Sequence, residues 1–381
     1  MKGEVMAGFT RRAMLLAAAA AAACARSTVY TQAAEQSLRE LAAAKGVDYG
    51  AMVTWKSWDG DNALSRGDAF AQLVERECSL IVSAMEMFWG LNAQTTGSFD
   101  FSGADDIADW AQGHGKKLRG HNLIWHEQTP KWFRGIDDAA YGEKMLVKHV
   151  QGLCKRFAGR MHSWDVANEV ISSETDRPDG LRKSKYLDLL GPGYLDTAFH
   201  AAREADPKAL LVINDYNIEY NVDHNEQKRR SLLKLIDGFK QRNTPIDAVG
   251  IQSHLWMDRR DIFDQGVLAG FLKEIADRGL QVMVTELDVI DVGAPSDIAT
   301  RDQAVAAYYK DYLDVALANP AVKTVVTWGL SDHDSWITHY SLDEFRRPDG
   351  MPPRPLPFDN DLKAKPAYFA LADAFKAAPA R

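Results

Sequence analysis

Two apolar segments of this sequence run into a glutamate: His162-Ser-Trp-Asp-Val-Ala-Asn-Glu169 and Gln281-Val-Met-Val-Thr-Glu286-Leu-Asp288. Both segments have the composition of buried strands, in which a carboxylate has no packing role. An unpaired buried charge costs several kcal/mol, so such a glutamate normally has a partner or a chemical task. The two glutamates are therefore the first candidates for a functional pair.

Strand-like segments recur along the whole chain and alternate with amphipathic stretches. The predicted strands are 47–54, 79–86, 117–124, 162–169, 209–216, 246–254, 280–287 and 323–330. The predicted helices are 66–77, 103–114, 139–158, 193–205, 224–242, 266–278, 299–318 and 363–376. Strands that each lead into a helix, repeated eight times, predict an α/β protein with a single (β/α)8 TIM barrel. We place this barrel at residues 45–381, after a lead-in at 26–44.

Residues 1–25 are predicted to be an export signal and not part of the fold. Basic residues precede an alanine-rich apolar run that ends in Ala23-Cys24-Ala25, which is typical of a secretory leader. Thr10-Arg11-Arg12-Ala13-Met14-Leu15 resembles a twin-arginine signal, and Ala22-Ala23-Cys24 resembles a lipoprotein acylation box. We expect an exported protein, periplasmic or secreted, with a membrane tether only if Cys24 is acylated.

Composition and charge exclude several classes of protein. The net charge is −8, and loss of the leader makes the chain more acidic, which argues against a nucleic-acid partner. Cys78 and Cys154 could pair in an oxidising compartment, but we predict two buried free thiols because they fall in different layers of the barrel. The cysteines and histidines lack zinc-site spacing, and the sequence implies no cofactor or catalytic metal. We expect a monomer acting on a neutral substrate.

Chemistry in such a barrel gathers where the strands end and their following loops begin. Polar and aromatic residues stand at these positions after six strands: His121, Trp125, His126; Asn168, Glu169; Asn214, Asp215, Tyr216, Asn217; Gln252, Ser253, His254; Glu286, Asp288; and Trp328, Asp332, Trp336. Chance would supply one or two such endings, not six in register. Two carboxylates at one barrel mouth provide a proton donor and a nucleophile, the pair that cleavage of a glycosidic bond requires.

Taken in order, these segments resemble glycoside hydrolase family 10, the endo-β-1,4-xylanases. The resemblance covers about 45–376 and rests on Arg119 through His126, Trp164 through Glu169, Ile213 through Asn217, Gly250 through His254, Thr285 through Asp288, Trp328 through Trp336, and Pro357 through Tyr368. It implies a retaining endo-β-1,4-glycanase, with Glu169 as general acid/base and Glu286 as nucleophile. Retention requires carboxyl groups about 5–5.5 Å apart.

The resemblance also implies roles for the surrounding residues. Asn168 would hydrogen-bond the 2-hydroxyl of the sugar, and His254 would donate to Glu286 with Asp288 orienting its ring. The acid needs surroundings that raise its pKa, whereas the nucleophile needs hydrogen-bond donors that keep it ionised. Further substrate contacts are expected from His121, Trp125, His126, Gln252, Tyr216, Trp328, Trp336, Trp89 and Lys56.

One segment departs from the family pattern. Where the family shows Thr-Pro-Glu-Asn-Glu-Met-Lys-Trp, whose first Glu, Asn and Lys bind glycone hydroxyls, this chain has Val82-Ser-Ala-Met-Glu-Met-Phe-Trp89. Each lost hydrogen bond to a buried sugar hydroxyl should cost on the order of 1 kcal/mol. We hypothesise that Trp55, Lys56 and Trp58 rebuild this subsite in a new shape; the competing interpretation is an exposed loop with incidental tryptophans.

The sequence leaves the substrate and the use of the site open. Xylan is the expected substrate, but a β-1,4-glucan or a bacterial exopolysaccharide could be cleaved on the same scaffold. A barrel that binds saccharide without turnover is a function of a different class. Glu169 and Glu286 could instead form ion pairs with basic residues at the barrel mouth, and Trp328 and Trp336 could simply pack the barrel end.

Overall fold

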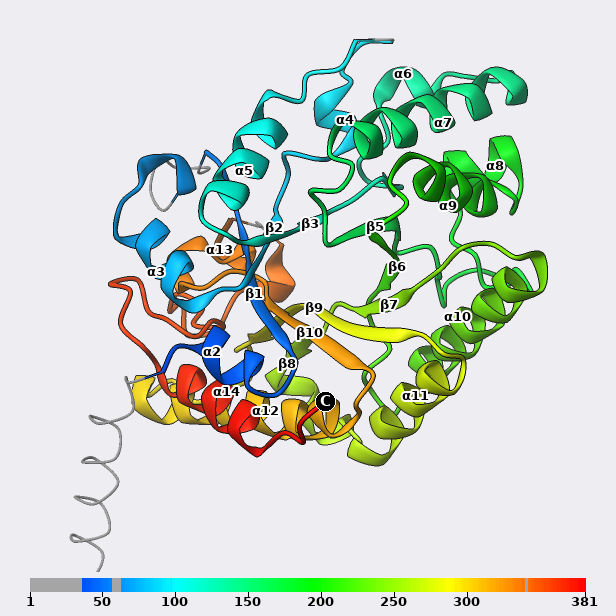
Figure 1. Cartoon of the computed structure of the whole chain (residues 1–381). Coiled ribbons are helices and arrows are strands. Elements are labelled where there is room, and N and C mark those ends of the chain that lie inside the picture. Colours follow the sequence, from blue (N-terminus) through cyan, green and yellow to red (C-terminus); the bar gives the residue numbers. More distant parts are fainter. Residues whose placement is uncertain (1–35, 57–62, 97, 340–341) are drawn as a thin grey trace, which may run out of the picture.

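A closed barrel of parallel strands forms the centre of the computed structural model, which describes residues 36–56, 63–96, 98–339 and 342–381 (Figure 1). The barrel strands are β1 (Asp48–Val53), β2 (Leu80–Ser83), β3 (Lys117–Gly120), β5 (Ser163–Asn168), β6 (Leu210–Asp215), β7 (Ala248–Ile251), β9 (Gln281–Ile290) and β10 (Val322–Thr327). Pairing of β10 with both β9 and β1 closes the ring. The predicted (β/α)8 barrel is confirmed. The predicted leader and Trp58 lie outside the described residues.

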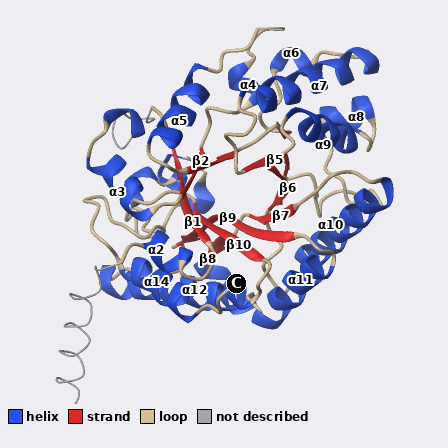
Figure 2. Ribbon diagram, in the orientation of Figure 1, coloured by secondary structure: helices blue, strands red, loops and turns tan. Residues whose placement is uncertain are grey.

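Helices surround the strand ring on its outside (Figure 2). The longer ones are α3 (Ala69–Glu77), α5 (Ser102–Gly113), α7 (Ala139–Arg156), α9 (Tyr194–Ala205), α10 (Asp223–Arg242), α11 (Gln265–Asp277), α12 (Ile298–Ala318) and α14 (Pro366–Ala377), close to the predicted bounds. Several begin at an aspartate whose carboxylate accepts the first free N–H groups, as Asp138 does for α7 and Asp264 for α11. These caps explain why the helices start where they do.

Short elements that the sequence did not predict lie mostly in the loops between barrel elements. They are α2 (Leu38–Ala43), α4 (Trp89–Asn92), α6 (Lys131–Arg134), α8 (Lys185–Leu190), α13 (Trp336–His339), η1 (Leu64–Arg66), η2 (Met257–Ile262), η3 (Asp332–Asp334), η4 (Asp343–Phe345) and the strands β4 (Ile124–Trp125) and β8 (His254–Trp256). β4 pairs with β5 and β8 with β9. These two strands extend the rim beside the predicted site.

The strands are buried on both faces, as expected for parallel strands covered by helices. Small apolar clusters fill the barrel, among them Val212 with Ala248 and Met283. Cys78 and Cys154 are both buried and free, which confirms the prediction of two unpaired thiols. Among the described residues, no helix is both long enough and apolar enough to cross a membrane.

Candidate active site

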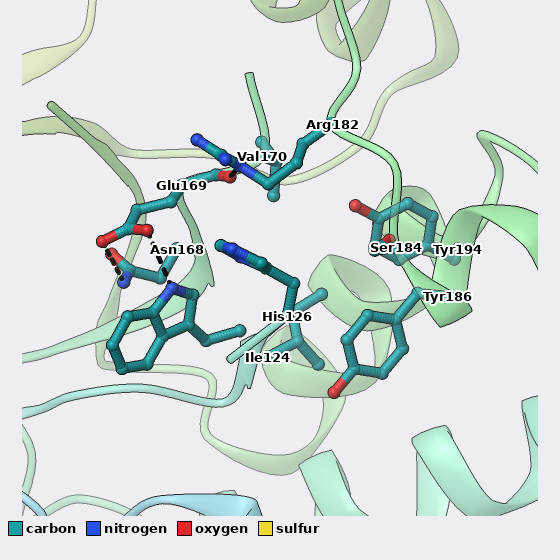
Figure 3. A pocket seen from close by; sticks show the side chains of 10 residues that line it. Ile124, His126, Asn168, Glu169, Val170, Arg182, Ser184, Tyr186 and Tyr194 are labelled. Carbon is teal, nitrogen blue, oxygen red and sulfur yellow. Dashed lines mark hydrogen bonds between the residues drawn. The ribbon is translucent and has the colours of Figure 1, made fainter. Parts of the chain in front are cut away.

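Glu169 follows the last residue of β5 and has a left-handed backbone conformation, with φ of 56°. This conformation is uncommon for a residue other than glycine and tends to occur at functional sites. Its carboxylate accepts a 2.9 Å hydrogen bond from Nε1 of Trp125 and a 3.2 Å bond from Nε2 of Gln252. The amide of Asn168 lies beside the same carboxylate (Figure 3).

The surroundings of Glu169 raise the pKa of its carboxyl group. Burial is the main cause, and the negative charges of Asp215 and Glu286 add to it, while the hydrogen bonds from Trp125 and Gln252 act in the opposite direction. A raised pKa favours the protonated form, which is the form that a general acid needs at the start of a reaction.

The surroundings of Glu286, on β9, have the opposite effect. Its carboxylate accepts a 2.7 Å hydrogen bond from Nδ2 of Asn214 and lies 3.1 Å from Nε2 of His254. Burial alone would raise the pKa of Glu286, but the hydrogen bond from His254, electrostatic interactions with His121 and His254, and the hydrogen bond from Asn214 lower it. Glu286 is therefore kept ionised, as a nucleophile must be.

His254 lies between two carboxylates at the start of β8. Its Nδ1 is 2.9 Å from Asp288, and its Nε2 faces Glu286. Burial alone would lower the pKa of His254, but the charges and hydrogen bonds of Asp288 and Glu286 raise it to about 10. The ring is thus a cation at neutral pH, and both of its N–H groups donate.

The two predicted aromatic platforms border this group. Nε1 of Trp336 donates to Asp288 at 2.7 Å, and the Trp336 ring lies 5.0 Å from that of His254. Trp328 is buried, with its ring 5.2 Å from His121 and 6.4 Å from His254. Trp336 therefore fixes Asp288 in addition to any contact it makes with a sugar.

Asn214 connects the two halves of the site, a role that the sequence did not reveal. Its Nδ2 donates to Oδ1 of Asn168 at 2.9 Å and to Oε1 of Glu286 at 2.7 Å. Asn168, Asn214 and Gly250 are register partners on β5, β6 and β7. A Cβ on Gly250 would collide with Oδ1 of Asn214. Two asparagines at the ends of neighbouring strands, followed by a glycine on the next strand, are a sequence signal that could have revealed the contact of Asn214 with Glu286.

His121 and Trp125 form the side of the site that follows β3. The His121 ring is buried, with Nδ1 2.8 Å from Asp165, which is also ion-paired with the buried Arg119. The Phe88 ring lies 5.7 Å from His121 and 5.5 Å from Trp125. A phenyl ring thus covers two predicted substrate contacts at the position where the family pattern has a lysine.

A small hollow lies beside Glu169 (Figure 3). Its lining residues are Ile124, Trp125, His126, Asn168, Glu169, Val170, Arg182, Ser184, Tyr186 and Tyr194. Burial, together with the charge of Arg182, lowers the pKa of His126 to about 4, so this ring is neutral. Tyr216 stands close by, since its hydroxyl accepts a 3.0 Å hydrogen bond from Arg182.

Not every predicted site residue lies at this mouth. Trp89 is only 2% exposed, and its ring stacks on His149 at 4.2 Å within the hydrophobic core. The prediction that Trp89 contacts substrate is therefore wrong, because α4 turns its side chain inward. Lys56 is exposed and ends a described segment, so the rebuilt subsite stays a prediction.

Within the described ranges, the acidic, histidine and cysteine side chains form no group of three that could hold a metal.

Comparisons with known proteins agree on one family. The model for "Glycosyl hydrolase family 10" matches residues 37–374. The endo-1,4-beta-xylanase A of Thermoanaerobacterium saccharolyticum is 34% identical over 332 residues, which are 83% of this chain and 26% of that protein. The exoglucanase XynX of Acetivibrio thermocellus is 34% identical over 83% of this chain and 28% of its own length. The endo-1,4-beta-xylanase 3 of Hypocrea jecorina is 31% identical, over 89% and 86% respectively.

Two solved structures share the whole barrel. The family 10 structure from Paenibacillus barcinonensis has a TM-score of 0.78 and 30% identity, covering 89% of this chain and 97% of that one. Xylanase 10B of Thermotoga petrophila, solved with xylobiose, has a TM-score of 0.77 and 27% identity over the same shares. This chain thus spans about a quarter of the first two relatives but nearly all of the two solved chains.

Proposed function

This chain belongs to glycosyl hydrolase family 10, and on that premise we propose that it is a retaining endo-β-1,4-xylanase. The observation that carries the proposal is the opposite shift of two carboxyl pKa values at one barrel mouth, raised for Glu169 and lowered for Glu286. Paired groups pushed apart in this way divide into an acid and a nucleophile. A barrel that only binds saccharide has no need of that difference.

The first half of the reaction is glycosylation of the enzyme. Glu169 donates its proton to the glycosidic oxygen while an oxygen of Glu286 attacks the anomeric carbon, and the bond to the leaving group breaks. The new ester is neutral, and the negative charge now lies on Glu169, which has given up its proton. Because His254 and Asn214 hold the attacking carboxylate from two sides, its orientation is fixed before the substrate binds.

The second half releases the sugar. Glu169, now ionised, removes a proton from water, the water oxygen bonds to the anomeric carbon, and Glu286 leaves as a carboxylate. Two inversions at one carbon give net retention. Asn168, which accepts hydrogen bonds from Asn214 and Gln252, is held where it can donate to the 2-hydroxyl of the reacting sugar.

The substrate assignment rests on the relatives. Two of the three relatives named above are endo-1,4-beta-xylanases, and one solved structure holds xylobiose. These relatives favour xylan over a β-1,4-glucan or an exopolysaccharide. The neutral polymer also suits a chain with a net charge of −8, which would repel polyanions.

A polysaccharide panel with product sizing tests the function. The purified protein should convert xylan to short oligosaccharides, with the β-anomer formed first in a time-resolved NMR spectrum. Glu169→Ala and Glu286→Ala serve as inactive controls. Binding of xylan without hydrolysis by the wild-type protein would reject the enzyme and support a saccharide-binding barrel.

We also propose that the protein is exported. The support is the leader-like composition of residues 1–25. Mass spectrometry of the N-terminus after expression in a host with an intact export system provides the test. A protein recovered only from the cytoplasm, with Met1 or Lys2 at its N-terminus, would contradict export.

A further inference from the structure

Arg182 contacts the backbone of Glu169 and of the two residues that follow it. Its Nε donates to the carbonyl oxygen of Glu169 at 2.6 Å, and its Nη2 donates to that of Ile171 at 3.3 Å. Its own backbone N–H donates to the carbonyl of Val170 at 2.7 Å. Three successive carbonyl groups are therefore held by a single residue, whose side chain reaches toward Glu169 in Figure 3.

This contact matters because Glu169 has a left-handed backbone conformation. Such a conformation persists only where the surroundings fix it on both sides. On the side of β5, the N–H of Glu169 donates to the carbonyl of Asn214 at 2.8 Å. On the other side, Arg182 holds the carbonyls, and Asp215 accepts the N–H of Ile171 at 3.0 Å.

Arg182 also reaches a residue that is predicted to touch the substrate. Its Nη2 donates to the hydroxyl of Tyr216 at 3.0 Å, and the guanidinium lies 5.7 Å from the centre of the Tyr216 ring. A second cation near this ring is Lys228, whose Nζ is 3.9 Å from the ring centre and donates to Asp215. Arg182 thus connects the backbone of Glu169 to an aromatic ring at the end of β6.

We propose that Arg182 is a positioning residue that sets the carboxyl group of Glu169 for proton transfer to and from the substrate. The inference rests on the proposed function. The hydrogen bonds to the carboxylate itself come from Trp125, Gln252 and Asn168, so Arg182 acts through the backbone. Its effect is therefore confined to steps in which Glu169 moves a proton, and binding of the glycone is left unchanged.

Leaving-group dependence separates positioning of the acid from a general structural role. The dinitrophenolate of a dinitrophenyl β-xylobioside leaves without a proton. The phenol of a phenyl β-xylobioside needs a proton from Glu169 in order to leave. The variants are Arg182→Met and Arg182→Lys. The matched control is Arg177→Met, because Arg177 lies in the same loop and its guanidinium pairs with Asp179, at 2.9 and 2.6 Å.

General acid catalysis contributes about 10²- to 10⁴-fold. We expect Arg182→Met to lose roughly 100-fold in kcat/KM on the phenyl glycoside, with KM nearly unchanged, and less than about 10-fold in kcat/KM on the dinitrophenyl glycoside. Arg182→Lys should lie between this variant and the wild type, because a lysine keeps the charge but lacks the planar guanidinium whose Nε and Nη2 reach the two carbonyls. Arg177→Met should match the wild type within about 2-fold on both substrates.

Two results would overturn the inference: equal losses on the two glycosides, or full activity of Arg182→Met on the phenyl glycoside. If Arg182→Met does not fold, as judged by circular dichroism, Arg182→Lys decides the question by the same ratio of losses. A wild-type protein inactive on both aryl glycosides rejects the proposed xylanase itself, so the two failures are distinguishable.

Discussion

Asn214 on β6 donates a 2.7 Å hydrogen bond to Glu286 on β9, although β7 lies between these two strands. The side chain passes over β7 at Gly250, where no Cβ blocks it. The proposed nucleophile is therefore oriented by a residue two strands away in the sheet, and this depends on a missing side chain in the strand between them.

Gly250→Ala should damage both the site and the fold. The added Cβ would collide with Oδ1 of Asn214 and would lie 2.9 Å from Thr285, so side chains must move. We expect a loss of about 1–3 kcal/mol in the free energy of unfolding, as for other overpacked interiors, with a fall in kcat. Urea denaturation and xylan hydrolysis measure the two effects.

Gly270→Ala is the matched control for this substitution. Gly270 lies within α11, and a Cβ there would meet no atom within 4 Å. Because alanine is the better helix former, this variant should gain about 0.5–1 kcal/mol. Equal behaviour of the two alanine variants would contradict the argument.

Removal of the Nε1–H donor of Trp125 should shift the alkaline limb of the pH–activity profile to higher pH. The hydrogen bond from Nε1 of Trp125 lowers the pKa of Glu169, while burial raises it. Trp125→Phe keeps the ring but loses the donor, so the pKa of Glu169 rises and the protonated acid persists to higher pH. We expect the alkaline limb of kcat/KM to shift up by about 0.5–1 pH unit.

The control for this profile is Trp110→Phe, since Trp110 of α5 stacks on the exposed His114 at the end of that helix. Its profile should overlay that of the wild type. An alkaline limb that moves to lower pH in Trp125→Phe would show that the hydrogen bond does not act on Glu169 as described.

His254 should make the stability of the fold depend on alkaline pH. Its pKa is about 10 in the folded protein, against about 6.5 for a free imidazole. A raised pKa contributes stability that is fully present below pH 6.5 and is lost as the pH rises through about 10. The contribution is on the order of a few kcal/mol.

His254→Gln lacks this titration and provides the comparison. The difference in the free energy of unfolding between the two proteins should shrink steadily from pH 6.5 to pH 10, as measured by urea denaturation at each pH. A difference that stays constant across this window would mean that His254 is not a cation in the folded state.

Lys56→Ala tests the rebuilt glycone subsite. If Lys56 binds a sugar hydroxyl, its loss should raise KM for the longer xylo-oligosaccharides by about 3- to 10-fold, since one such hydrogen bond is worth on the order of 1 kcal/mol. Lys208→Ala is the control, because Lys208 is exposed before β6, at the opposite end of the barrel. An unchanged KM and chain-length preference in Lys56→Ala would end the hypothesis.

The barrel could be predicted because its strands are apolar and its helices are amphipathic, so burial alone marks them. The strand-end polar residues were predictable for the same reason, since Glu169 and Glu286 have no packing role at the end of a buried apolar run. His254 and Asp288 were found as strand ends, and the structure brings His254 to Glu286 and Asp288 to the other side of the His254 ring.

The remaining features depend on three-dimensional relationships that no local pattern carries. Asn214 required the register of β5, β6 and β7. Arg182 lies in a loop that folds back to the end of β5 through the bridge of Ile171 with Leu181, and loop paths have no periodicity. The prediction for Trp89 was wrong because an aromatic residue soon after a strand resembles a substrate-binding residue. In the structure, α4 directs its side chain into the core.

The two buried thiols have a consequence for how the protein can be made. Cys78 and Cys154 are unpaired, and burial raises the pKa of both, so neither offers a reactive thiolate. Folding of the barrel therefore requires no oxidant, and glutathione should neither lower nor restore its stability. The same folded cylinder is compatible with the reducing interior of a cell and with the oxidising medium outside it.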